Sequence, residues 1–128
     1  MSTQKINTLN NNDEIAIAIP EVMLKQNAEF NIGEIIFHRE HDFRAVIVDV
    51  DPQFEGSEEW YDMHTSNQPP KNVPWYHVLV DEESTMAYVS EQNICIDNDD
   101  NGEIENPMID DLFSKFDSGH YLPRQTLN

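Results

Sequence analysis

Short apolar segments separated by turn residues are the feature that most restricts the fold of this chain. In each segment the apolar side chains recur at alternate positions, as in a β-strand, and turn or polar residues follow. The segments cover residues 30–38, 43–51, 73–81, 85–91 and 93–96. We therefore predict a mainly β protein in which five antiparallel strands form a small SH3-like barrel. A chain of 128 residues buries enough surface for one core without disulfides.

The alternation also predicts which side chains share a face of the sheet. In the segment 43–51, one face is expected to carry Ala45, Ile47 and Asp49, and the other Val46, Val48 and Val50. In the segment 73–81, the corresponding sets are Trp75, His77 and Leu79, and Tyr76, Val78 and Val80.

Two short helices are predicted beside the strands. Residues 57–64 suit a helical turn with Ser57 as its N-cap. Residues 106–116 suit a C-terminal helix, because Asn106 is a favourable N-cap, Pro107 fits the first turn and Gly119 follows soon after the end. The apolar face of this helix is expected to consist of Met108, Ile109, Leu112, Phe113 and Phe116.

Three parts of the chain are expected. Residues 1–27 form an N-terminal extension that is partly disordered, because its first twelve residues are polar and without periodicity. Residues 28–96 form the β-barrel domain, and residues 97–128 form an acidic linker, the short helix and a tail. The polar tail from Arg124 to Asn128 is expected to be loosely held, and removal of residues 121–128 is expected to leave the fold intact.

The charge restricts the classes of partner. The chain has 25 acidic and 7 basic residues, and residues 30–96 alone carry a net charge of −10. Tight DNA binding depends largely on Lys and Arg that neutralise phosphates, so the charge disfavours a DNA-binding role. The single cysteine, Cys95, and the lack of a long apolar segment favour a cytoplasmic protein rather than a secreted or membrane protein.

Motifs for catalysis or metal binding are weak in this sequence. It has neither a G-x-S-x-G motif nor a glycine-rich phosphate loop, so we expect no enzyme and no cofactor. Residues 97–102 match the start of a calcium-binding loop, but Met108 stands where the closing glutamate is needed. His38 and His41 are three residues apart near a strand end, where their side chains are expected to diverge. We therefore predict no metal site.

Several segments resemble one known family in their order and approximate spacing. They are FNIGEIIFHR (30–39), FRAVIVDVDP (43–52), PWYHVLVD (74–81) and YVSEQNI (88–94), with a weaker match in LPRQTLN (122–128). Together they resemble the HspQ heat-shock protein family, also called the YccV-like or hemimethylated-DNA-binding family.

This resemblance implies a small β-barrel-like fold and two activities. One is partnership with the ATP-dependent Lon protease, in which the protein is a non-enzymatic heat-shock adaptor that promotes degradation of denatured or selected proteins, such as the replication initiator. The other is preferential binding of hemimethylated DNA. We take the adaptor as the leading hypothesis, because the acidic charge opposes DNA binding. The expected partners are a Lon-type protease and its client proteins, and self-association stays open.

Candidate binding residues follow from residue type and position. Trp75, Tyr76 and His77 are either packed core residues or an aromatic recognition patch, and the sequence does not separate these readings. The predicted C-terminal helix either packs on the barrel or presents Leu112, Phe113 and Phe116 to a partner, with Arg124 in the tail behind it. If DNA binds, the first candidates for phosphate contact are Arg39, Arg44 and Lys71.

Overall fold

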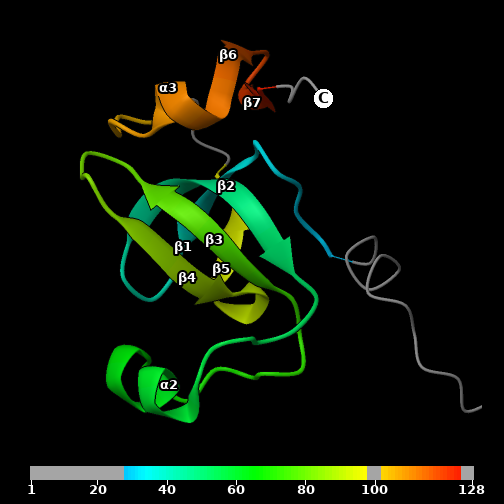
Figure 1. Cartoon of the computed structure of the whole chain (residues 1–128), viewed down its shortest axis with the longest axis vertical. Coiled ribbons are helices and arrows are strands. Elements are labelled where there is room, and N and C mark those ends of the chain that lie inside the picture. The colour runs from blue at the N-terminus through cyan, green and yellow to red at the C-terminus, as the bar shows by residue number, and fades with distance from the viewer. Residues whose placement is uncertain (1–27, 98–101, 125–128) are drawn as a thin grey trace, which may run out of the picture.

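A five-stranded antiparallel sheet forms the centre of the computed structural model, which describes residues 28–97 and 102–124 (Figure 1). The strand order is β4-β3-β2-β1-β5. The bounds are β1 (Ile35–His38), β2 (Phe43–Asp51), β3 (Trp75–Val80), β4 (Met86–Ser90) and β5 (Ile94–Ile96). The predicted five antiparallel strands are therefore confirmed. The predicted barrel is not found as a closed structure, because β4 and β5 remain the two edges of this sheet within the described residues.

Both faces of the sheet are buried, which explains why its strands are so rich in apolar residues. On one face Ala45, Ile47, Tyr76 and Val78 belong to one core cluster, which Phe30 covers. On the other face are Ile35, Val46 and Leu79, which belong to a second cluster. The predicted faces of Tyr76, Val78 and Leu79 are confirmed by this division.

A β-bulge in β2 changes the predicted faces of its last residues. Ile47 pairs with Val78 and Asp49 pairs with His77, so Val48 is an extra residue without a partner. After the bulge Val50, rather than Asp49, shares the core with Ala45 and Ile47. The predicted assignment of Asp49 and Val50 was therefore wrong, because a single inserted residue reverses the alternation.

The helix predicted over residues 106–116 is wrong over most of its length. Helix α3 is only four residues long (Ile109–Leu112), and a hairpin of β6 (Phe113–Asp117) and β7 (His120–Pro123) follows it. Asn106 does start the turn before α3, because its Oδ1 accepts a hydrogen bond from the N–H of Met108 (3.0 Å). Ser118 and Gly119 have φ values of 55° and 86°, which suit a two-residue hairpin turn with positive φ at both positions.

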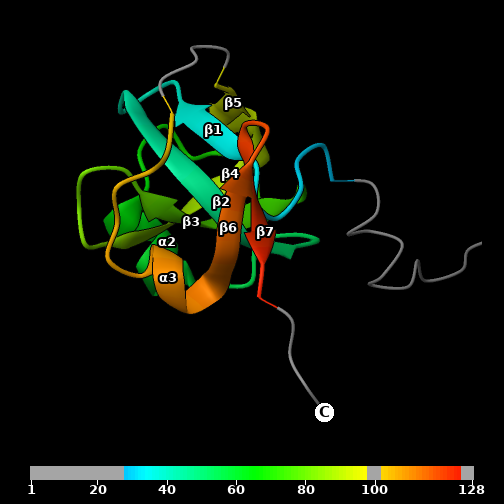
Figure 2. The ribbon, with the colours of Figure 1, turned by 90° about the horizontal axis from the view of Figure 1, so that it is seen from above.

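The hairpin is part of the core rather than an attached tail (Figure 2). Tyr121 is 2% exposed and packs with Phe113 and Ile104 against Val46 and Leu79. Its backbone N–H donates to the carbonyl of Gly33 (2.8 Å), and its hydroxyl accepts a hydrogen bond from the N–H of Ile104 (2.8 Å). The expectation that residues 121–128 can be removed without loss of the fold therefore conflicts with the packing of Tyr121.

Helix α2 (Glu58–His64) lies at the end of the sheet opposite to α3, β6 and β7 (Figure 1). Ser57 is its N-cap, as predicted, and its side chain accepts a hydrogen bond from the N–H of Trp60 (3.0 Å). Among the described residues, no helix is long and apolar enough to cross a membrane. The predictions for residues 1–27, for the centre of the acidic loop and for the final four residues lie outside the part of the chain that the structure describes.

Candidate binding site

Five aromatic side chains meet where α2 packs against the sheet, and we call them the aromatic cluster. Centroids of rings in contact are 4.8–6.4 Å apart, within the usual range for packed aromatic pairs. The hydroxyl of Tyr61 donates to the carbonyl of Pro69 (2.6 Å), and Nε1 of Trp75 donates to the carbonyl of Pro70 (2.9 Å). These bonds fix α2 and the residues after it against β3. The members are Phe54, Trp60, Tyr61, Trp75 and Tyr88.

A cavity of about 470 Å³ lies beside the aromatic cluster, and we call it the β4 groove. All five residues of β4 line it, together with the β1–β2 turn and with side chains on and after α2. Its size is within the range of ligand-binding clefts. Glu40 is the one carboxylate among the residues found to line it, and four histidines accompany it: His38, His41, His64 and His77.

A polar network joins β2, β3 and β4 at the edge of the groove. Oδ2 of Asp51 accepts a hydrogen bond from the hydroxyl of Tyr88 (2.7 Å) and lies 3.1 Å from Nε2 of His77. Burial raises the pKa of Tyr88, and the bond to Asp51 raises it further, so this hydroxyl stays protonated as a donor. Asp49, Asp51 and His77 place one ligand atom each within 4.8 Å of one another. These bonds account for the positions of Asp51 and His77 without a metal.

His38 and His41 are neighbours at the other side of the groove. Their rings stack with centroids 4.9 Å apart, and the backbone N–H of His41 donates to Nδ1 of His38 (3.1 Å). His38 is 3% exposed, and its ring also stacks on Phe43. Burial lowers the pKa of His38, and the neighbouring His41 lowers it further, while Glu40 opposes both. Contrary to our expectation, the two side chains do not diverge.

The three residues predicted as an aromatic patch have different surroundings. Trp75 and Tyr76 are 1% and 0% exposed, so neither offers an exposed recognition surface. The hydroxyl of Tyr76 donates to the carboxylate of the half-buried Glu91 (2.5 Å). His77 is half-buried and lines the β4 groove. Of the three, His77 therefore gives the most side-chain surface to the groove, and Trp75 contributes to its wall.

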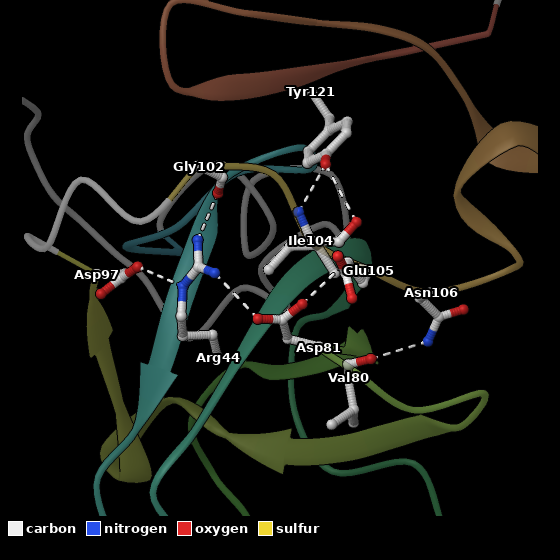
Figure 3. A network of polar contacts seen from close by, with 9 residues as sticks. All are labelled: Arg44, Val80, Asp81, Asp97, Gly102, Ile104, Glu105, Asn106 and Tyr121. Atoms are coloured by element: carbon white, nitrogen blue, oxygen red, sulfur yellow. Dashed lines mark hydrogen bonds and ion pairs between the residues drawn. The ribbon is translucent and has the colours of Figure 1, made fainter.

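The three basic residues predicted for DNA contact are all engaged within the protein. Arg44 is 15% exposed and bonds Asp97 (2.8 Å), Asp81 (3.0 Å) and the carbonyl of Gly102 (2.5 Å), as Figure 3 shows. Lys71 pairs with Glu58 and lies 4.2 Å from the ring centre of Tyr61. Arg39 is exposed, and its guanidinium donates to the carbonyl of Gln92 (2.7 Å).

Figure 3 also shows what the Arg44 network does for the fold. Asp81 accepts from Arg44 and also from the N–H of Glu105 (2.7 Å), while the side chain of Asn106 donates to the carbonyl of Val80 (3.0 Å). These bonds tie the segment before α3 to the ends of β2 and β3. Arg44 is therefore a structural residue here.

The predicted C-terminal binding residues do not form one surface. Phe113 is 3% exposed and belongs to the second core cluster, and Phe116 is half-buried against it. Leu112 is 37% exposed. Arg124 is exposed, and its Nε donates to the carbonyl of Asp110 (2.7 Å), which connects the end of β7 to α3.

The chain matches the model of a known protein family over most of the described residues. A family model described as "Hemimethylated DNA-binding protein YccV like" matches residues 28–120. The chain belongs to the YccV-like family. The resemblance found in the sequence is thereby confirmed, and the description of the YccV-like family names a binding activity rather than a reaction. The matched range continues past β5 into the hairpin, as expected if Phe113 and its neighbours are part of the folded unit.

Sequence reasoning missed Trp60 and Tyr88, which form much of the groove wall. Tyr88 could have been found, because the register of the β3–β4 hairpin places it directly opposite His77. Aromatic side chains opposite one another on adjacent strands are expected to interact. Trp60 had no such signal, because nothing in the sequence of α2 indicates which way the helix turns against the sheet.

Proposed function

We propose that this chain is a non-enzymatic cytoplasmic adaptor that acts in heat stress. It binds exposed segments of denatured or selected client proteins and promotes their degradation by a Lon-type ATP-dependent protease. The β4 groove is the observation that carries this proposal, because an open cleft lined by aromatic, histidine and apolar side chains suits a protein segment.

The chemistry of the groove supports a protein ligand in two ways. Trp60 and Tyr88 are fixed by the aromatic cluster, so they supply contact area at little cost in side-chain entropy. Histidine and tyrosine also supply polar atoms for the backbone of a bound segment. The same groove has no cluster of cations among its described residues with which to hold a phosphate.

The negative net charge of the chain favours some client proteins over others. With 25 acidic and 7 basic residues, the chain repels acidic polypeptides and attracts basic ones before contact. Clients are therefore expected to offer neutral or basic segments.

Hemimethylated-DNA binding is the alternative, and the description of the YccV-like family favours it. Two of the five described Lys and Arg residues argue against it, because Arg44 and Lys71 are in ion pairs within the protein. Of the three predicted DNA contacts, Arg39 is the exposed one.

The direct test adds the purified full chain to a Lon-type protease and a chemically denatured, carboxymethylated protein substrate. We expect faster degradation with the chain present. Trp60→Ala should lose most of this stimulation because it removes a wall of the groove. Met63→Ala is the matched control, because Met63 is on the same helix, is 73% exposed and does not line the groove.

Thermal unfolding of both variants shows whether the fold survives each change. Stimulation that is equal for the wild type and for folded Trp60→Ala would exclude the groove as the client site. No stimulation by the wild type would contradict the adaptor proposal itself.

A further inference from the structure

The backbone of β4 presents free hydrogen-bonding groups to the β4 groove. The N–H of Val80 donates to the carbonyl of Thr85 (3.1 Å), and the N–H of Glu91 donates to the carbonyl of Pro74 (3.0 Å). These two bonds fix which residues of β4 direct their N–H and C=O groups toward β3, namely Ala87 and Val89. The backbone groups of Met86 and Tyr88 therefore point away from β3, where no bond from the described residues meets them.

This edge lacks the devices that usually protect edge strands. Such strands carry charged side chains, proline or bulges that prevent pairing with another strand. β4 has the sequence MAYVS, which contains none of these, and its pairing with β3 is regular over all five residues. Met86 is 45% exposed, whereas Ser90 is buried, so the accessible part of the edge runs from Met86 to Tyr88.

The walls of the groove restrict what can pair with this edge. His41 in the β1–β2 turn lines one part of it, and Trp60 and His64 of α2 line another. A folded sheet brings more than one strand and side chains on both faces, so these walls oppose its approach. A single extended chain needs only the width of one strand, about 4.8 Å beyond β4.

We propose that β4 binds an extended segment of a client protein as an additional β-strand, through backbone hydrogen bonds at Met86 and Tyr88. The segment is poor in acidic residues, because a chain of net charge −18 repels like charge, and it carries alternate apolar side chains that contact Trp60 and Met86. Strand addition of this kind takes its affinity from the main chain and its selectivity from alternate side chains. This inference rests on the proposed function, since it names how a client is held.

Pairs of N-methylated peptides test this mode of binding. The probe is an acetylated and amidated octapeptide of alternating valine and lysine, titrated against the full chain. One derivative is N-methylated at every valine and the other at every lysine, so each loses the donors along a different edge. We expect one derivative to bind as tightly as the parent and the other to bind about tenfold or more weakly. Equal affinities, or equal losses, for the two derivatives would contradict strand addition.

A second measurement uses the protein side of the same bonds. Met86→Pro removes an outward N–H at the first residue of an edge strand, where proline is tolerated, and Met86→Ala keeps this N–H. We expect Met86→Pro to weaken parent-peptide binding about fivefold or more beyond the effect of Met86→Ala. Equal binding by the two folded variants would overturn the proposal.

These binding measurements contain no protease, so they separate the two proposals. Peptide binding with the expected N-methyl pattern, together with no effect on degradation, would remove the adaptor role and leave strand addition standing. Stimulated degradation without the expected N-methyl pattern would remove strand addition and leave the adaptor role standing.

Discussion

His38 is a titratable side chain in a place that disfavours its charge. It is 3% exposed, stacks on Phe43 and receives a hydrogen bond from the backbone of His41 at Nδ1, which requires the unprotonated nitrogen. The neutral form is therefore part of the packing between β1 and the start of β2. Acid is therefore expected to destabilise the fold at this residue.

We predict that stability falls with acidification through His38. Its pKa is lowered in the folded protein, chiefly by burial, so the unfolded chain binds the proton more readily. The contribution of neutral His38 to the free energy of unfolding is complete above the unfolded pKa of about 6.5. It is lost as the pH falls through the lower pKa of the folded protein, and the free energy changes by no more than about 1.4 kcal/mol per pH unit. Denaturant unfolding measures the free energy of unfolding between pH 7.5 and 5. This free energy should fall less steeply with decreasing pH for His38→Gln than for the wild type.

His41→Gln is the control for this prediction. It removes the neighbouring charge but leaves the burial of His38, which is the larger cause of the shift. The free energy of unfolding of His41→Gln should therefore depend on pH nearly as steeply as that of the wild type. A slope for His38→Gln equal to that of the wild type would show that other groups carry the acid sensitivity.

At the scale of elements, Gly33 joins the β6–β7 hairpin to the sheet. Its N–H donates to the carbonyl of Ile47 (2.8 Å), its carbonyl accepts from Tyr121 (2.8 Å), and its φ is +94°. A Cβ at this position would lie 2.0 Å from the carbonyl oxygen of Tyr121. No side chain fits there unless the hairpin moves away from β2.

Gly33→Ala should therefore cost much more stability than Gly119→Ala. Both glycines have positive φ, but a Cβ on Gly119 meets no atom within 4 Å. Gly119→Ala should cost about 1–2 kcal/mol from backbone strain alone. Gly33→Ala should exceed this by about 2 kcal/mol or more because of the clash, as measured by urea unfolding. Similar losses at the two positions would mean that the hairpin is not held tightly at Gly33.

Two truncations test whether β7 is part of the folded unit. Removing residues 121–128 deletes β7 and with it Tyr121, one of the side chains that cover Ile35, Val46 and Leu79. We expect a loss of about 3 kcal/mol or more and a clear fall in the thermal midpoint. Removing only residues 125–128 keeps every described contact of the hairpin and should leave the midpoint nearly unchanged. A midpoint retained by the longer truncation would contradict this view of the core.

The elements that the sequence predicted well are those with local determinants. β1 to β4 follow from alternation and turn residues, and α2 follows from Ser57 and its N-cap bond. The C-terminal helix failed because Phe113 and Phe116 fit a helical period, while Ser118 and Gly119 formed a hairpin turn instead. Burial of Phe113 and Tyr121 against the sheet decided between the two, and that contact is not local in sequence.

At the scale of the whole molecule, the sequence predicted the balance of charge but not its arrangement. The sequence offers Arg44 and Lys71 as candidates for phosphate contact, because nothing in their local sequence shows that Asp81 and Glu58 pair with them. His77 was named as a site candidate and does line the groove, but Trp75 and Tyr76 are buried within the fold. A groove that needs β4, α2 and the β1–β2 turn together appears only once those elements are packed.

The arrangement of charge gives the final prediction, which concerns duplex DNA. Of the three predicted phosphate contacts, Arg44 and Lys71 are already paired, so binding would release few counterions from DNA. At 0.15 M salt we expect a Kd no tighter than about 10⁻⁶ M and no preference for hemimethylated over unmethylated duplex. Fluorescence anisotropy with both duplexes measures this. Nanomolar binding with such a preference would contradict it and restore the DNA-binding alternative. Arg39→Gln would then be the first variant to measure, because Arg39 is exposed and no ion pair holds its guanidinium among the described residues.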